Sequence, residues 1–146
     1  MTSIGFDEQE LISRAFQALQ RSYSPYSKFR VGAALVSTEN EIFGGANVEN
    51  ASYGGAICAE RTALVKAVSE GHKRFQALAV VSDLDEPITP CGILLNKKSG
   101  RQFIREFFSP ETPILLVSQA HPANNASETS YKGPLIKRTN ISVLLP

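Results

Sequence analysis

The sequence predicts an α/β fold, a three-layer helix–sheet–helix sandwich with a mixed β-sheet. The expected elements follow one another as helix, hairpin, helix, strand, helix and strand, an order typical of a sheet covered by helices on both faces. Residues 75–82 (FQALAVVS) form a nearly continuous apolar run, which indicates a central strand buried on both sides. The chain has 146 residues, of which 42% are hydrophobic and 20% charged, so we expect one compact domain over residues 1–146.

The first predicted element is a helix over residues 7–22. Its apolar side chains recur at helical spacing, and Asp7 can cap its start. Pro25 and the serines around it then break the pattern, which favours a loop. The helix is expected to contribute packing and no chemistry.

A β-hairpin is predicted next, with strands over residues 30–37 and 41–47. The polar residues 38–40 separate two strand-like segments, as expected for a short hairpin turn. Gly44 and Gly45 lie near the end of the second strand. Glycine inside a strand indicates either a bulge or the close approach of another backbone.

Residues 58–69 form the strongest predicted helix of the chain. Gly71 follows its last turn and can end it, because glycine readily adopts the left-handed conformation of a C-terminal cap. The apolar face of this helix contains Ala59, Ala63, Leu64, Ala67 and Val68. A further helix is expected to continue over residues 101–108, and residues 112–118 are predicted to form a last core strand.

The charge of the chain excludes several classes of partner. The formal net charge is +1 and no long basic run is present, so we expect neither a nucleic-acid polymer nor a membrane surface as partner. No segment is long and apolar enough to span a bilayer, and the N-terminus lacks the features of a secretory signal. We therefore expect a cytoplasmic protein with reduced thiols; a disulfide between Cys58 and Cys91 is the alternative.

Candidate site residues gather at the start of the helix over residues 58–69. A thiol at a helix N-terminus has a lowered pKa, so Cys58 suits metal binding, and Glu60 follows two residues later as a proton carrier. Without Glu60 and the second thiol, Cys91, a buried structural cysteine would be favoured. The two histidines, His72 and His121, are expected at the surface rather than as ligands.

Polar residues at the exit of the second predicted strand belong to the same candidate site. Asn47 and Glu49 alternate with the apolar Val48, and loops that leave strand ends often carry function. Taken alone, the two polar residues would be ordinary turn residues. Their closeness in sequence to Cys58 and Glu60 favours a role in the site instead.

Six segments of the chain match, in order, the motifs of one family: residues 23–29 (YSPYSKF), 30–34 (RVGAA), 47–51 (NVENA), 58–63 (CAERTA), 90–92 (PCG) and 101–107 (RQFIREF). The chain thus resembles the small, homotetrameric, zinc-dependent cytidine deaminases of pyrimidine salvage. The resemblance implies their α/β fold and the hydrolytic deamination of cytidine or deoxycytidine to uridine or deoxyuridine. It also implies Zn²⁺ as cofactor, a small-molecule nucleoside as substrate and a homotetramer as the assembly.

The resemblance implies roles for the residues of the metal centre. Cys58 and Cys91 would be Zn²⁺ ligands, and Glu60 would carry protons between water and the substrate. Arg61 would sit beside the ligand thiolates and offset their charge.

The resemblance also implies roles in substrate binding. Asn47 and Glu49 would hydrogen-bond the ribose hydroxyls, Phe29 would lie against the pyrimidine, and Ala59 would offer backbone groups to the base. Tyr53 would reach into the site of a neighbouring subunit, since the family's sites form at subunit interfaces.

The chain departs from the family at one motif, Pro-Cys-Gly-x-Cys-Arg-Gln. Eight residues, 93–100 (ILLNKKSG), stand where the family has two, so the second cysteine position falls on Leu94 or Gly100. Neither side chain binds zinc, and we expect weak or absent zinc binding as a result. Read-through at a splice junction and a natural variant are the two explanations of the extra residues.

The missing ligand leaves more than one functional interpretation open. The first is an active zinc-dependent deaminase. The second is a catalytically impaired subunit that binds nucleoside or assembles with an active paralogue. A third, a deaminase acting on a polynucleotide, is disfavoured by the net charge of +1 and by the ribose-binding pair Asn47 and Glu49, which suits a free nucleoside.

Overall fold

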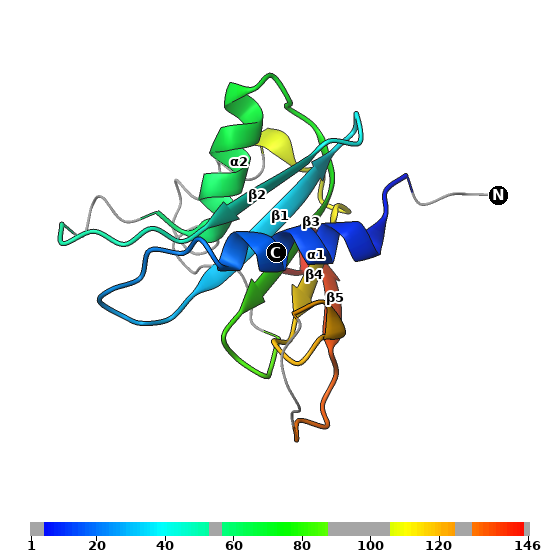
Figure 1. Ribbon diagram of the computed structural model, residues 1–146. Coiled ribbons are helices and arrows are strands. Elements are labelled where there is room, and N and C mark those ends of the chain that lie inside the picture. The colour runs from blue at the N-terminus through cyan, green and yellow to red at the C-terminus, as the bar shows by residue number, and fades with distance from the viewer. Residues whose placement is uncertain (1–4, 53–56, 88–105, 125–129, 145–146) are drawn as a thin grey trace.

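A computed structural model describes residues 5–52, 57–87, 106–124 and 130–144 (Figure 1). Its centre is a five-stranded sheet in the order β2-β1-β3-β4-β5. The strands are β1 (Val31–Ser37), β2 (Ile42–Ala46), β3 (Phe75–Ser82), β4 (Pro113–Val117) and β5 (Ile136–Asn140). Strands β3 and β4 run parallel and the other neighbours are antiparallel. The mixed sheet and the central place of β3 are therefore confirmed.

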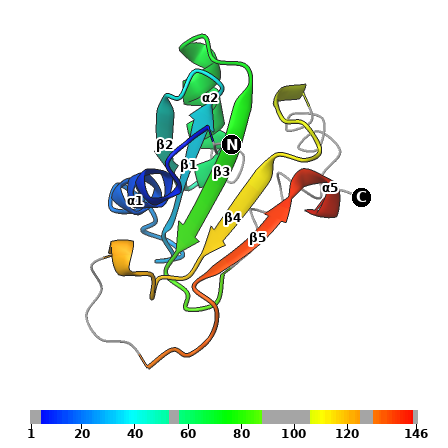
Figure 2. The same cartoon turned by 90° about the vertical axis from the view of Figure 1, so that its right-hand side faces the viewer.

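Within the described residues, one long helix covers each face of the sheet, as Figures 1 and 2 show. Because side chains alternate along a strand, β1 serves both helices. Ala34 and Val36 lie in one core cluster with the buried side chains of α1 (Glu8–Leu19), whereas Ala33 and Leu35 lie in another with those of α2 (Ala59–Ser69). This arrangement confirms the predicted helix–sheet–helix layers.

The ends of both helices follow from local chemistry. The carboxylate of Asp7 accepts a hydrogen bond from the backbone N–H of Glu10 at 3.2 Å, so the predicted cap of α1 is confirmed. At the end of α2, Gly71 has a φ of +98° and donates to the carbonyl of Val68 at 3.0 Å, and His72 N–H donates to the carbonyl of Ala67 at 3.0 Å. These two bonds form a Schellman motif, which confirms Gly71 as the stop.

The C-terminal part of the chain differs from the prediction. β5 lies at the edge of the sheet, where its side chains are half-buried or exposed. Its sequence, IKRTN, accordingly has no apolar face. It is followed by the short helix α5 (Ile141–Leu144), and a 3₁₀ turn, η2 (Pro122–Asn124), precedes it. Of the helix predicted over residues 101–108, Glu106 and Phe107 are described and helical. No helix in the described ranges could cross a membrane.

Gly45 permits a close contact between α2 and β2. Of the two explanations predicted for a glycine in this strand, the close approach of another backbone is therefore the one that applies to Gly45. A Cβ atom added to Gly45 would lie 2.8 Å from the carbonyl oxygen of Ala59 and closer still to the backbone nitrogen of Ala63. These atoms belong to the first turns of α2 and cannot move without moving the helix. Gly45 therefore sets the distance between the sheet and the helix that carries the candidate site.

We expect Gly45→Ala to lower the free energy of unfolding by about 1–3 kcal/mol, the usual cost of forcing extra volume into a packed interface. Urea denaturation measures the effect. Gly44→Ala is the matched control, because a Cβ there would lie 3.3 Å from the Ala18 side chain and no closer than 3.6 Å to any backbone atom beyond its chain neighbours. An equal loss of stability in both variants would contradict the role of Gly45 as the contact point.

Both histidines lie inside the structure, so the expectation that they are surface residues is wrong. The exposed fraction is 9% for His72 and 7% for His121. His72 packs against Phe43, with ring centroids 4.9 Å apart, and its Nδ1 lies 3.0 Å from Oε1 of Glu39. His121 stacks on Phe16 at 6.3 Å, and its Nδ1 accepts a hydrogen bond from Ala123 N–H at 3.1 Å. The expectation that neither histidine is a metal ligand is a separate prediction, which their burial does not test.

The burial of His121 makes the stability of the fold depend on pH. Desolvation lowers the pKa of His121, and the carboxylate of Glu8 offsets part of this effect. The unfolded chain then binds the proton more readily than the folded chain, so stability is full above about pH 6.5 and falls as the pH drops through the folded pKa.

We expect His121→Asn to remove this component of the acid loss, because an amide oxygen can replace Nδ1 as acceptor without titrating in this range. Urea midpoints from pH 7.5 down to pH 5 measure it. Parallel curves for the parent chain and the variant would show that His121 does not contribute.

Candidate active site

The chain segment after β2 lies between two other segments and brings the predicted site residues together. Tyr23 N–H donates to the carbonyl of Asn47 at 3.0 Å, and Glu49 N–H donates to the carbonyl of Tyr23 at 2.8 Å. On its other side, Val48 exchanges two backbone hydrogen bonds of 2.9 Å with Ile57. Because Ile57 directly precedes Cys58, this pairing holds Asn47 and Glu49 beside the start of α2.

The side chain of Asn47 joins three parts of this structure. Its Oδ1 accepts hydrogen bonds from Val31 N–H at 3.0 Å and from the hydroxyl of Ser22 at 2.5 Å. Its Nδ2 donates to the carbonyl of Phe29 at 2.9 Å. Asn47 therefore fixes the backbone of Phe29 next to the strand exits. Ser22 was missed by the sequence analysis, and no motif pointed to it.

We expect Asn47→Ala to lower the free energy of unfolding by about 1–3 kcal/mol, because the substitution leaves part-buried polar groups without their partner. Thermal or urea unfolding measures the loss. Asn50→Ala is the matched control, since the exposed Asn50 side chain accepts a local hydrogen bond from Ser52 N–H at 2.9 Å and makes no other with a described residue. If Asn47→Ala proves as stable as Asn50→Ala, the side chain does not hold the site together.

Glu49 organises the loop that precedes β1. Its Oε1 accepts hydrogen bonds from the backbone N–H groups of Tyr26 at 3.0 Å and Ser27 at 3.1 Å, and its Oε2 accepts one from the hydroxyl of Ser27. The hydroxyl of Ser27 in turn accepts from Phe29 N–H at 3.1 Å. The bonds from the hydroxyl and backbone of Ser27 lower the pKa of Glu49, which keeps its carboxylate ionised.

An ion pair closes the same loop from the other side. The backbone N–H of Arg30 lies 2.9 Å from Oδ2 of Asp83, and its Nη2 lies 2.8 Å from Oδ1. The side-chain hydrogen bond to Asp83 raises the pKa of Arg30. This contact ties the start of β1 to the end of β3, and both carboxylate oxygens of Asp83 take part in it. Asp85 likewise accepts a hydrogen bond from Gln119 at 3.0 Å.

Cys58 and Glu60 occupy the start of α2. Cys58 is the N-cap residue with extended backbone angles, one position before the helix rather than within its first turn as predicted. Its carbonyl accepts hydrogen bonds from the backbone N–H and the hydroxyl of Thr62, both at 3.0 Å. Glu60 has an exposed fraction of 2% and Ala59 of 1%, whereas Arg61 is half-buried. A carboxylate buried this deeply is costly unless it has a specific role or partner.

The described residues fit one half of the predicted metal centre. Cysteine at a helix start is a donor that Zn²⁺ accepts, and a structural or catalytic zinc site needs at least three such protein ligands. In the ranges that the structure describes, no group of three His, Cys, Asp or Glu side chains could hold a metal. Cys91 and Tyr53 lie outside the described residues, as do residues 93–100. The second half of the metal centre therefore rests on the sequence.

Comparison with known proteins identifies the relatives of this fold and site. The family described as "Cytidine and deoxycytidylate deaminase zinc-binding region" matches residues 6–114. A cytidine deaminase of Sporosarcina psychrophila is 41% identical over 140 residues, which cover 96% of this chain and 89% of that protein. A probable cytidine deaminase of Dictyostelium discoideum is 52% identical over 100 residues, which cover 68% of this chain and 64% of that protein.

Solved structures agree with the sequence comparison. The crystal structure of a cytidine deaminase from Burkholderia pseudomallei matches with a TM-score of 0.77 and 37% identity, covering 96% of this chain and 97% of that one. A cytidine deaminase from Mycobacterium tuberculosis matches with a TM-score of 0.70 and 32% identity over 96% of this chain and 94% of that one. The predicted fold and the resemblance are both confirmed, and the chain belongs to the cytidine deaminase family, whose zinc-binding region it contains.

Proposed function

We propose that this chain catalyses the hydrolytic deamination of cytidine or deoxycytidine to uridine or deoxyuridine, with Zn²⁺ as cofactor. The observation that carries the proposal is the placement of the buried Glu60 and of Cys58 at the start of α2, beside the segment of Asn47 and Glu49. Membership of the deaminase family supports the same conclusion.

Each residue at the start of α2 has a role in this proposal. Cys58 and Cys91 would hold the zinc, which when bound lowers the pKa of a water molecule to about 7 and makes it a nucleophile. As the water oxygen bonds to C4 of the cytosine, the carboxylate of Glu60 would accept its two protons in turn. It would pass the first to N3 and the second to the amine, which leaves C4 as ammonia. Arg61 offsets the charge of the thiolates, and the backbone of Ala59 meets the base.

The remaining hydrogen-bonding capacity of Asn47 and Glu49 suits a sugar hydroxyl. Three bonds to described residues leave Asn47 with one amide hydrogen, and three bonds leave Oε2 of Glu49 with one acceptor position. A hydroxyl both accepts and donates, so one ribose hydroxyl could use both groups. Phe29, whose backbone Asn47 holds, would then lie against the pyrimidine.

The assembly and location follow from the same proposal. We infer a single domain over residues 1–146 that acts in the cytoplasm as a homotetramer, in which Tyr53 completes the site of a neighbouring copy. Light scattering of the purified chain tests the assembly: a monomer that turns over cytidine would exclude a shared site.

A catalytically impaired subunit is the second candidate function, because the family's next cysteine position is filled by Leu94 or Gly100. The loss of cytidine absorbance on adding the purified chain, together with its zinc content, separates the two candidates. Turnover with zinc present supports the enzyme. Binding of cytidine in a calorimeter without turnover supports the impaired subunit. The absence of both binding and turnover contradicts both candidate functions.

A further inference from the structure

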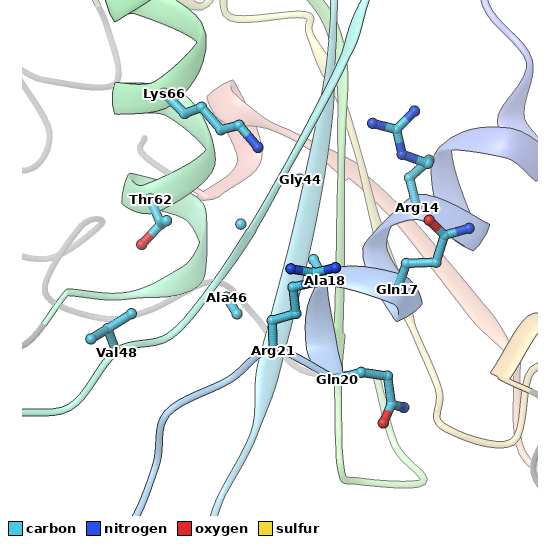
Figure 3. Close-up of a pocket in the computed structure, with 11 residues that line it drawn as sticks. Arg14, Gln17, Ala18, Gln20, Arg21, Gly44, Ala46, Val48, Thr62 and Lys66 are labelled. Atoms are coloured by element: carbon cyan, nitrogen blue, oxygen red, sulfur yellow. The ribbon is translucent and has the colours of Figure 1, made fainter.

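A groove runs along the free edge of β2, an edge strand of the sheet. It has a volume of about 610 Å³, within the range of small-molecule sites. Helix α1 lines it on one side and α2 on the other, as Figure 3 shows. Among the described residues, its lining contains three cationic side chains, Arg14, Arg21 and Lys66, and no carboxylate.

The strand edge adds backbone donors to these cations. Hydrogen bonds from Ser37 N–H to the carbonyl of Glu41 and from Asn47 N–H to the carbonyl of Val31 set the alternation between β1 and β2. The intervening residues Gly44 and Ala46 therefore direct their backbone groups away from β1, because only alternate residues bond to one neighbour. Both residues line the groove, and Gly44 has no side chain to cover its backbone.

Two of the three cations in the groove have no counter-ion in the described part of the chain. Arg21 and Lys66 make no ion pair there, and Arg14 lies 3.9 Å from the exposed Glu10 while donating to the carbonyl of Ile42 at 3.2 Å. In Figure 3, Lys66 extends from α2 and Arg21 from the turn after α1 toward the strand between them. Two cations from opposite walls and outward N–H groups between them are the donors that phosphate groups prefer.

We propose that this groove binds a phosphate-rich anion, such as an inorganic polyphosphate or a nucleoside polyphosphate. The site is separate from the candidate active site, because Asn47 and Glu49 direct their side chains to the loop of residues 22–31. A nucleoside is uncharged and has no need of three cations. A second copy of the chain docked edge to edge would bring like charges together, which disfavours that occupant.

Titration of the full-length protein with sodium tripolyphosphate in a calorimeter tests the proposal, against NaCl at equal ionic strength because weak charge contacts are screened by salt. We expect saturable binding. The double variant Arg21→Gln and Lys66→Gln should weaken it about tenfold or more, because two charge-assisted hydrogen bonds to the phosphate groups are lost. Circular dichroism checks that the variant is folded.

The matched control removes the same charges elsewhere. Lys73→Gln with Arg74→Gln also loses one lysine and one arginine, both exposed and outside the groove, and should leave the affinity unchanged. Equal weakening by both pairs, or no saturable binding, overturns the site. A parallel titration with a nucleoside triphosphate identifies the source of the phosphate. Tighter binding than that of tripolyphosphate indicates that the groove also contacts the nucleoside. Equal affinity indicates that the groove recognises the phosphate chain alone.

Discussion

Replacing residues 93–100 by Ala-Cys is expected to raise the zinc content of the purified chain toward one per chain and to increase cytidine turnover by about 10–100-fold or more. Loss of a group that hydrogen-bonds a metal ligand typically lowers metal affinity or activity by this factor. A missing thiolate ligand should lower them at least as much. The replacement recreates the motif Pro-Cys-Gly-Ala-Cys-Arg-Gln from Pro90 to Gln102. Metal analysis and the absorbance assay measure the two effects.

The matched control for this replacement is Ala-Ser, which shortens the segment equally and withholds only the sulfur. Ala-Ser should bind zinc as weakly as the parent chain, whereas Ala-Cys should bind it tightly. A parent chain that already holds one tight zinc would contradict the expectation, because a substitute ligand would then exist. An equal gain in both shortened variants would show that the length of the segment, and not the thiolate, limits activity.

Glu60→Gln is expected to lower kcat by about 10²–10⁴-fold, the usual contribution of a positioned acid–base group. Glutamine has nearly the same shape as glutamate, so it should fill the 2% exposed position of Glu60 without opening a cavity, but it cannot accept and return a proton. The measurement is steady-state turnover of cytidine in the shortened Ala-Cys chain, together with its zinc content.

Glu70→Gln provides the control, because Glu70 is exposed and ends the same helix. It should leave both kcat and zinc content unchanged. If Glu60→Gln retained full turnover, Glu60 would not be the proton carrier. If it lost zinc as well as activity, Glu60 would act on the metal centre rather than on the substrate alone.

The elements with a strong local signal were predictable from the sequence. The apolar run of β3 and the glycine after α2 each have one dominant physical interpretation, and the structure confirms both. β5 was missed because an exposed edge strand needs no apolar face, so its residues show no periodic pattern. α1 ends at Leu19 instead of residue 22 because the chain tightens there into turns, with Arg21 N–H donating to the carbonyl of Ala18 at 2.9 Å. Such a change in the last turn carries no sequence signal.

The candidate site was predictable in its residue types and less so in its contacts. Asn47, Glu49, Cys58 and Glu60 stand in short motifs, and the structure brings their segments together. The hydroxyl of Ser22 and the ion pair between residues 30 and 83 join positions far apart in the chain, and nothing in a single sequence indicates such pairs. The burial of both histidines was missed for the same reason.

The hydrogen bonds of Asn47 and Glu49 have a consequence for the thermodynamics of binding. They already hold residues 23–29 in one conformation before any ligand arrives. A nucleoside that docks on this preorganised loop would lose little conformational entropy from ordering it. Affinity would then depend on contacts to the ligand itself, and a calorimetric series of nucleosides should show a small and nearly constant entropic penalty.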